Sequence, residues 1–250
     1  MACAIVMAVV VCSMLNAFVF AAPVDRFTEI LSENSGYSSS NEPINLKLCI
    51  AFRRRSTVPL DKCETAECRE SVCERTKAFR VPKVYLNIKP NWAGGEQVFI
   101  GLLAVYPTMK AWSVSAPVEK GAGDINRIAI KLARQESGRT AGEKARLLNN
   151  GRMTQQKGAG DGFVHYRSAD PRMASLGWEY LAPTQGGDNT FVFCADRAPV
   201  SKGGPLRCVV HLDLSDDIHL EYQIAREYLP QLNEIDSSVK KLIAAFQVSD

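Results

Sequence analysis

Apolar and polar side chains alternate along two neighbouring stretches in the last third of the chain, which is typical of half-buried β-strands. Residues 206–214 and 218–225 both show this period of two. A loop of three residues, 215–217, separates them, and an odd loop length keeps both apolar sets on one face of a hairpin. The apolar positions of that face are Val210, Leu212, Leu214, Ile218, Leu220 and Tyr222.

The polar positions of the same hairpin fall on its outer face. The register predicts that Asp213 lies opposite His219 and that His211 lies opposite Glu221, so each histidine gains a carboxylate neighbour. Such pairs commonly decorate a solvated sheet face, and we interpret them in that way. A hydrolase that uses this face for acid–base chemistry is the alternative.

The final segment of the chain predicts an amphipathic helix. Pro230 suits its first turn, where a missing N–H costs nothing. Apolar residues then recur every three or four positions and form one stripe, which predicts a helix packed on one face of the sheet. The stripe consists of Leu232, Ile235, Val239, Leu242, Ile243 and Phe246.

Further strands are predicted along the rest of the chain. The cysteine-rich segment 61–75 predicts a short helix from its Glu, Ala and Arg content. The three tryptophans, Trp92, Trp112 and Trp178, are expected in the core or at its edge, and Trp92, in a Gly-rich turn, is expected to be the most exposed of them. Together the elements predict an α+β fold, an antiparallel β-meander with a C-terminal amphipathic helix packed on one face and disulfides as staples. The expected strands are 44–52, 81–88, 97–106, 127–132, 162–167, 176–182 and 189–194.

The first 21 residues contain no charged side chain and are almost entirely apolar, which is typical of a secretory signal peptide cleaved between Ala21 and Ala22. An uncleaved membrane anchor is the alternative, because the apolar stretch approaches the roughly 20 residues that span a bilayer. We expect a flexible segment at 22–43 and a single α+β domain at 44–250. Contact with a membrane is expected only through the leader, if it stays uncleaved.

Six cysteines follow the leader, and an exported chain favours disulfides. Cys194 ends one predicted strand and Cys208 begins the next, so we expect these two to pair. The pairing among the other four stays open; they are Cys49, Cys63, Cys68 and Cys73. A zinc site at residues 63–73 is the alternative, but its spacing is wide and no histidine is near, so no metal is expected.

Positive charge is concentrated in one part of the chain. Residues 127–157 contain eight basic side chains against two acidic ones, a net charge of +6, whereas the whole chain carries +3. The polar, Gly-rich excursion at 134–161 overlaps most of this part and is the candidate contact surface for an acidic protein partner. Nucleic acid is not expected as a partner. The candidate partner-binding residues are Arg134, Arg139, Lys144, Arg146, Arg152 and Lys157.

Sequence motifs of common enzymes are missing. The chain has no Gly-x-Ser-x-Gly and no His-Glu-x-x-His, and its two Lys-Gly-Ala-Gly-Asp repeats lack the features of a phosphate-binding loop. Every mature cysteine has a candidate disulfide partner, which leaves no odd thiol as a nucleophile. We therefore expect no cofactor and no catalytic residue, although carboxylate-based hydrolysis leaves no readable motif.

Two stretches carry a family resemblance. The first runs from Phe79-Arg-Val-Pro-Lys-Val-Tyr-Leu through Gly94-Gly-Glu-Gln to Val105-Tyr-Pro; the second combines Cys208-Val-Val-His-Leu, Leu220-Glu-Tyr-Gln-Ile and Leu229-Pro-Gln-Leu-Asn-Glu-Ile-Asp. Both resemble uncharacterised exported proteins of proteobacteria, some of which are similar to periplasmic immunity proteins against secretion-system toxins. The resemblance implies a periplasmic or secreted bacterial protein and identifies no site residue.

These observations favour an exported, non-enzymatic binding protein, an immunity-type antagonist of a toxin or envelope enzyme. A module that binds an envelope lipid or glycan is one alternative, and an unrecognised hydrolase is another.

Overall fold

The computed structural model describes ten stretches of the chain, all of which lie within one unit that spans Tyr37–Asp250. They are residues 38–54, 71–112, 125–135, 140–141, 143–144, 153–156, 162–171, 178–183, 190–195 and 206–249. The expected leader at 1–21 and its cleavage site lie outside these residues. Within them, no helix combines the length and apolarity needed to cross a membrane.

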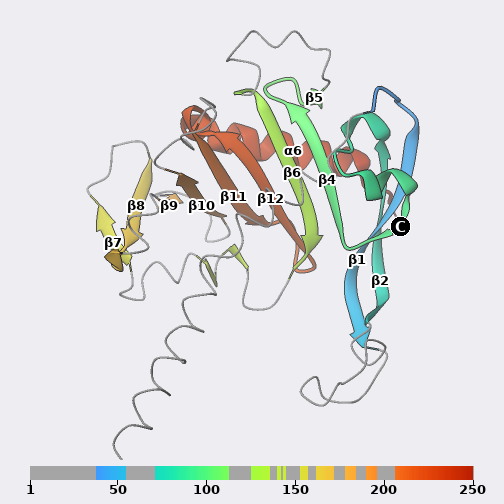
Figure 1. The fold of residues 1–250 in the computed structure, drawn as a ribbon, viewed down its shortest axis with the longest axis horizontal. Coiled ribbons are helices and arrows are strands. Elements are labelled where there is room, and N and C mark those ends of the chain that lie inside the picture. Colours follow the sequence, from blue (N-terminus) through green and yellow to red (C-terminus); the bar gives the residue numbers. More distant parts are fainter. Residues whose placement is uncertain are drawn as a thin grey trace, which may run out of the picture. The chain divides into compact units, whose positions relative to one another are not determined.

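Within the described residues the larger of two sheets has nine strands, and every neighbouring pair in it is antiparallel (Figure 1). The strand order is β5-β4-β6-β12-β11-β10-β9-β8-β7. Its strands are β4 Phe99–Val105, β5 Lys110–Ala111, β6 Arg127–Arg134, β7 Met153–Gln156, β8 Phe163–Ser168, β9 Trp178–Pro183, β10 Thr190–Ala195, β11 Arg207–Asp213 and β12 Ile218–Ala225. The predicted meander from β8 to β12 is confirmed, with ends shifted by one or two residues.

The hairpin of β11 and β12 has the predicted register. Val210 pairs with Tyr222 and Leu212 pairs with Leu220, and all four side chains are at most 2% exposed. Successive side chains of a strand point to opposite faces, so these residues define the core face of the sheet. On β6, Ile130 and Leu132 continue the same face.

Helix α6, Leu232–Phe246, covers that core face. The predicted stripe packs into the core, with Ile235 and Val239 fully buried. Asp236 accepts a hydrogen bond from the hydroxyl of Tyr222, which ties the helix to β12. Pro230 lies in the 3₁₀ turn η4, Arg226–Gln231, that precedes α6. The expected α+β architecture is confirmed.

The smaller sheet has the order β2-β1-β3, with β1 Pro43–Arg54, β2 Ser71–Pro82 and β3 Gly95–Gln97. Strand β1 pairs antiparallel with β2 and parallel with β3. Its apolar face shares the core with α6 and the larger sheet, through Leu46 and Leu48 among others. Both sheets therefore enclose one hydrophobic core.

Two local predictions in this region are wrong. The helix expected at 61–75 is contradicted from Ser71 onward, because pairing along the whole of β1 holds this stretch extended in β2. The strand expected at 81–88 ends at Pro82, whose ring nitrogen carries no hydrogen for a ladder. The chain then forms two 3₁₀ turns, η2 Lys83–Tyr85 and η3 Lys89–Ala93.

Trp92 is partly buried against the core, which fits a residue at the edge of the core. Its indole Nε1 donates a hydrogen bond to the carbonyl of Leu86 at 3.0 Å. The turn that carries it ends at Gly94, whose φ of 72° lies in the left-handed region that glycine adopts without strain.

In the described part of the chain, each of two disulfides joins neighbouring antiparallel strands. The structure contains the disulfide expected between Cys194 of β10 and Cys208 of β11, which are directly opposite each other. It also joins Cys49 of β1 to Cys73 of β2. Cys63 and Cys68 lie outside the described residues.

Candidate functional site

Two cross-strand pairs of polar side chains lie side by side on the sheet face opposite α6. His211 of β11 is paired with Glu221 of β12, and Asp213 is paired with His219. Both pairings agree with the register predicted from the loop length. We call these four residues the histidine cluster.

His211 is buried and the other three residues of the histidine cluster are half-buried, which corrects the expectation of a solvated face. The side chains of His211, His219 and Glu221 are 6%, 13% and 14% exposed, and that of Asp213 is 16% exposed. Alternation along a strand indicates which residues share a face, but it carries no information on what covers that face.

The ring nitrogens of the two histidines face each other. His211 Nδ1 lies 3.1 Å from His219 Nε2 and 3.7 Å from a carboxylate oxygen of Glu221. His219 Nδ1 is buried, lies 3.6 Å from Asp213 Oδ1, and makes no hydrogen bond within the described part of the chain. That separation is too long for a hydrogen bond.

The basic excursion contributes a cation to the cluster. Thr140 and Glu143 form a capping box: the Thr140 hydroxyl accepts from the Glu143 amide at 3.0 Å, and the Glu143 carboxylate accepts from the Thr140 amide at 2.9 Å. The Ala141 amide donates to both carboxylate oxygens of Asp213 at 3.1 Å. These bonds fix the turn over β11, and from it Lys144 Nζ lies 3.0 Å from His211 Nδ1.

The surroundings hold both imidazoles in their neutral form. Burial, aided by the charge of Lys144, places the pKa of His211 well below its usual value. Burial and Lys144 also lower the pKa of His219, to about 4, although Asp213 acts in the opposite direction. Burial raises the pKa of Glu221. At neutral pH the cluster therefore offers two uncharged nitrogen donors beside carboxylate groups.

Aromatic rings border the cluster on the β10 side. The ring of Phe193 stacks on His211, with centroids 5.6 Å apart and planes inclined by 16°, and Phe191 lies 5.9 Å from the same imidazole. Tyr180 of β9 continues this row, 6.0 Å from Phe191. The aromatic row places apolar surface rather than water beside His211, which strengthens electrostatic interactions within the cluster.

Two of the six candidate partner-binding residues have described positions. Arg134 lies at the end of β6, with its guanidinium carbon 5.0 Å from the ring centroid of Phe52. Lys144 contacts the histidine cluster rather than extending into solvent as a free charge. The other four lie outside the described residues; they are Arg139, Arg146, Arg152 and Lys157.

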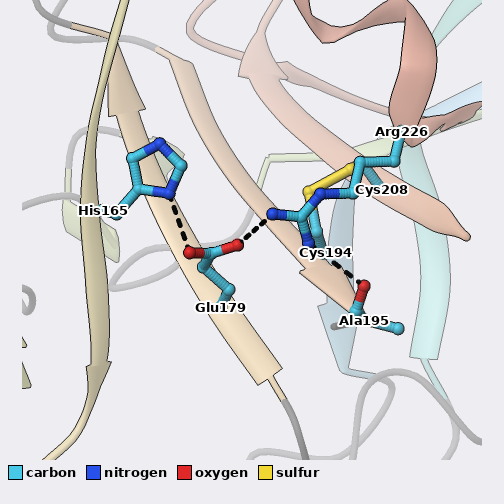
Figure 2. The surroundings of a disulfide bond; sticks show 6 residues. All are labelled: His165, Glu179, Cys194, Ala195, Cys208 and Arg226. Atoms are coloured by element: carbon cyan, nitrogen blue, oxygen red, sulfur yellow. Dashed lines mark hydrogen bonds and ion pairs between the residues drawn. A yellow bond between two sulfur atoms is a disulfide. The ribbon is translucent and has the colours of Figure 1, made fainter. Parts of the chain in front are cut away.

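A second polar network lies on the core face, beside the Cys194–Cys208 disulfide (Figure 2). His165 Nδ1 of β8 donates to Glu179 of β9 at 2.7 Å, and the other Glu179 oxygen accepts from Arg226. Arg226 also donates to the carbonyl of Ala195 at 3.4 Å. The network links strands β8, β9 and β10 to the turn before α6, so it acts as a structural tie.

Sequence reasoning missed most of these contacts. His165 pairs directly with Leu181, so Glu179 lies diagonally from it and no simple alternation indicates the bond. Lys144 comes from a segment distant in sequence from β11. The capping box Thr-x-x-Glu at 140–143 was the one readable signal, because it marks the start of a helical turn inside the excursion.

The nitrogen and oxygen atoms of the cluster are arranged as ligands of a metal ion could be. Among the described residues, His211, His219 and Glu221 bring one ligand atom each to within 4.8 Å of the others. Two neutral imidazoles and a carboxylate form a donor set that binds divalent transition metals. The same atoms can otherwise share protons.

Comparisons with known proteins concern the fold. No protein-family profile and no curated protein sequence matches the chain. The structure is similar to an immunity protein of the Stenotrophomonas maltophilia type IV secretion system, with a TM-score of 0.50 and 14% identity over 84% of this chain and 95% of that one. The iron-regulated outer membrane lipoprotein FrpD of Neisseria meningitidis matches with a TM-score of 0.43 and 11% identity over 86% of this chain and 99% of that one. The expected resemblance to exported immunity-type proteins is thus confirmed in the fold.

Proposed function

We propose that the protein is an exported, non-enzymatic binding protein that antagonises a toxin or an envelope enzyme by binding it, as an immunity protein does. The observation that carries this proposal is the fold likeness to a secretion-system immunity protein, which extends over 84% of this chain and 95% of that one. A shared fold does not by itself imply a shared function. Three properties of this chain therefore have to support the proposal.

The first property is the state of the cysteines. Two disulfides join strands of both sheets, Cys49 to Cys73 and Cys194 to Cys208. Such bonds are typical of proteins that fold in an oxidising compartment. Together with the apolar segment 1–21, they support a periplasmic location, where a toxin delivered to the cell envelope would be met.

The second property is the burial of the most reactive group of side chains. His211 and His219 are at most 13% exposed, and the 140–144 turn and the aromatic row border them. A hydrolase needs its acid and base within hydrogen-bond reach of a bound substrate. A buried cluster supports a structural use of these residues over a hydrolytic one.

The third property is the concentrated positive charge of residues 127–157. An acidic partner would be steered toward such a surface, and the effect would weaken with salt. We place the partner contact on the excursion at 134–161, with Arg139, Arg146 and Arg152 as the residues to test.

The experiment combines binding with protection. The mature protein would be mixed with the toxins of secretion systems encoded in the same genome, and complexes would be measured by gel filtration and calorimetry. We expect a stoichiometric complex with one toxin, and restored growth when the exported chain is co-expressed with that toxin directed to the periplasm.

A charge-reversal variant tests the contact surface. The triple variant Arg139→Glu, Arg146→Glu, Arg152→Glu should slow association by about tenfold at low salt. Lys241→Glu, at an exposed position of α6, is the matched control and should bind like the wild type. Failure to bind any toxin, together with failure to protect cells, would overturn the proposal. Envelope lipid or glycan retained in native mass spectra would instead favour a small-ligand module.

A further inference from the structure

The histidine cluster contains an unresolved conflict between hydrogen-bond donors. His211 Nδ1 has Lys144 Nζ at 3.0 Å and His219 Nε2 at 3.1 Å. An imidazole nitrogen has one lone pair in the ring plane, so it accepts from one of these groups and not from both.

The second nitrogen of His219, Nδ1, adds a further conflict, which depends on which ring nitrogen carries the proton. If Nε2 carries the proton, Nδ1 is bare and faces the Asp213 carboxylate at 3.6 Å, acceptor against acceptor. If Nδ1 carries it, the bare Nε2 faces His211 Nδ1, whose lone pair already receives Lys144. Neither neutral form of His219 satisfies all the contacts, and buried polar atoms without partners are rare in folded proteins.

We infer that His211 Nδ1, His219 Nε2 and a carboxylate oxygen of Glu221 bind a divalent transition-metal ion of the zinc class, with Asp213 as the hydrogen-bond partner that orients His219. A cation between the two nitrogens takes both lone pairs. The remaining proton of His219 then lies on Nδ1, directed at Asp213. One ion thus uses both lone pairs and leaves a proton for Asp213, while Lys144 has to leave His211 Nδ1.

The separations fit such an ion. Zn–N bonds of 2.0–2.1 Å at a tetrahedral angle place two nitrogen ligands about 3.3 Å apart, and the two histidine nitrogens are 3.1 Å apart. Glu221 lies 3.7 Å from the first of them, and all three ligand atoms fall within 4.8 Å. The fourth position is left for a water molecule.

Asp213 is held in place for its supporting role. Both its oxygens accept from the Ala141 amide, so its position is fixed by the 140–144 turn. Metal-bound histidines characteristically donate their other N–H to a carboxylate, and loss of that partner lowers metal affinity by about 10- to 100-fold.

Lys144 competes with the ion. Its ammonium group contacts the nitrogen that the metal would use, and Lys131 adds a second positive charge nearby, against the two carboxylates of the cluster. The lysine side chain is long and flexible, so it can leave the nitrogen without any movement of the strands. Removal of Lys144 should therefore tighten metal binding.

Sequence spacing does not reveal this site, which explains why no metal was expected. The ligands follow the pattern His-x7-His-x-Glu, which matches no common zinc motif, and the hairpin register brings them together. Such an ion would bridge β11 and β12 next to their turn and needs no protein partner.

The test uses the full mature chain without a histidine tag, stripped of metal by chelation. Zn²⁺ is titrated by calorimetry, and Co²⁺ serves as the spectroscopic probe. We expect one ion per chain, a visible Co²⁺ spectrum of a tetrahedral site, and a rise in melting temperature with metal.

Four variants separate the roles. Glu221→Gln and His219→Gln should lose binding. Asp213→Asn should weaken it by about 10- to 100-fold, whereas Lys144→Ala should bind at least as tightly as the wild type. Near-UV circular dichroism shows whether each variant keeps its packed core. If a ligand variant does not fold, the opposite effects of Asp213→Asn and Lys144→Ala still decide the question.

Two results would overturn the inference. One is the absence of Zn²⁺ and Co²⁺ binding by the wild type. The other is binding that persists unchanged in the folded ligand variants, because the ion would then lie on other groups, such as Cys63 and Cys68.

Discussion

Gly101 of β4 packs directly against Ile88, so closely that a β-carbon on Gly101 would lie 2.4 Å from Ile88 Cγ1 and 2.6 Å from Asn87 Oδ1. The Gly101 amide also donates to the Asn91 side chain at 3.0 Å. The lack of a side chain thus lets the 3₁₀ turns η2 and η3 lie on the sheet.

Gly101→Ala should destabilise the protein by about 1–3 kcal/mol, because overpacking in a tight core forces neighbours to shift. Chemical denaturation measures the change. Ile88→Ala removes one of the two clashing groups, so the double variant should lose less than the sum of the two single changes. Additive losses would show that the two residues do not share this contact.

Val239→Ala in α6 should lower the free energy of unfolding by about 2–3 kcal/mol, because a buried valine loses two methyl groups and leaves a cavity. Val239 is fully buried, whereas Val248 is 44% exposed. Val248→Ala is therefore the matched control, with little change expected. Equal losses in the two variants would contradict the packing of α6 on the sheet.

Removal of the Cys194–Cys208 disulfide by the double change to alanine should cost about 3 kcal/mol, because the unfolded chain regains the entropy of a closed loop. The loop between Cys49 and Cys73 is longer, with a separation of 24 residues against 14. Its removal should cost at least as much. Both losses are measured by chemical denaturation without reductant. A double-alanine variant that unfolds at the same denaturant concentration as the wild type would show that its disulfide does not stabilise the protein.

Acidification should weaken the hydrogen bonds that Glu179 accepts from His165 and Arg226. Burial alone raises its pKa, but hydrogen bonds from His165 and Arg226 outweigh burial, and the pKa lies below its usual value. A lowered carboxyl pKa contributes stability above the unfolded value of about 4.5, and this contribution is lost as the pH falls through the folded-state pKa.

The stability of the wild type relative to Glu179→Gln should therefore decline as the pH falls below about 4.5. Denaturation series between pH 3 and pH 7 measure the difference. The comparison isolates Glu179, because other acid-sensitive groups remain in both proteins. A difference that stays constant over this range would show that the carboxylate is not held by these partners.

The pattern of apolar and polar residues was sufficient to predict those elements whose structure depends on neighbouring residues in the sequence. The register of β11 and β12 depends on alternation and on a three-residue loop, and α6 depends on a periodic stripe, so both were predicted. The disulfide between Cys194 and Cys208 follows from adjacent strands. By contrast, residues 71–75 at the start of β2 belong to a segment whose composition favours a helix locally, and pairing with β1 holds them extended.

The cross-strand pairs of the candidate site could be predicted from the sequence, but their surroundings could not. The neighbours of His211 and His219 across the ladder were predicted, because register is a local property. Their burial was not, because Lys144 and Ala141 reach the cluster from another part of the chain. The mutual approach of the two ring nitrogens depends on side-chain torsions that no alternation pattern specifies.

Strand β12 lies between β6 and β11 in the larger sheet. Strand β6 thus gains its second neighbour only when residues 218–225 are available, long after β4 and β6 have been made, and α6 follows later still. A chain that emerges from its N-terminus onward therefore lacks the middle of its sheet until synthesis is almost complete. A chain that stops before residue 218 would therefore leave β6 and β11 without the strand that joins them, and the larger sheet would fall into two separate parts.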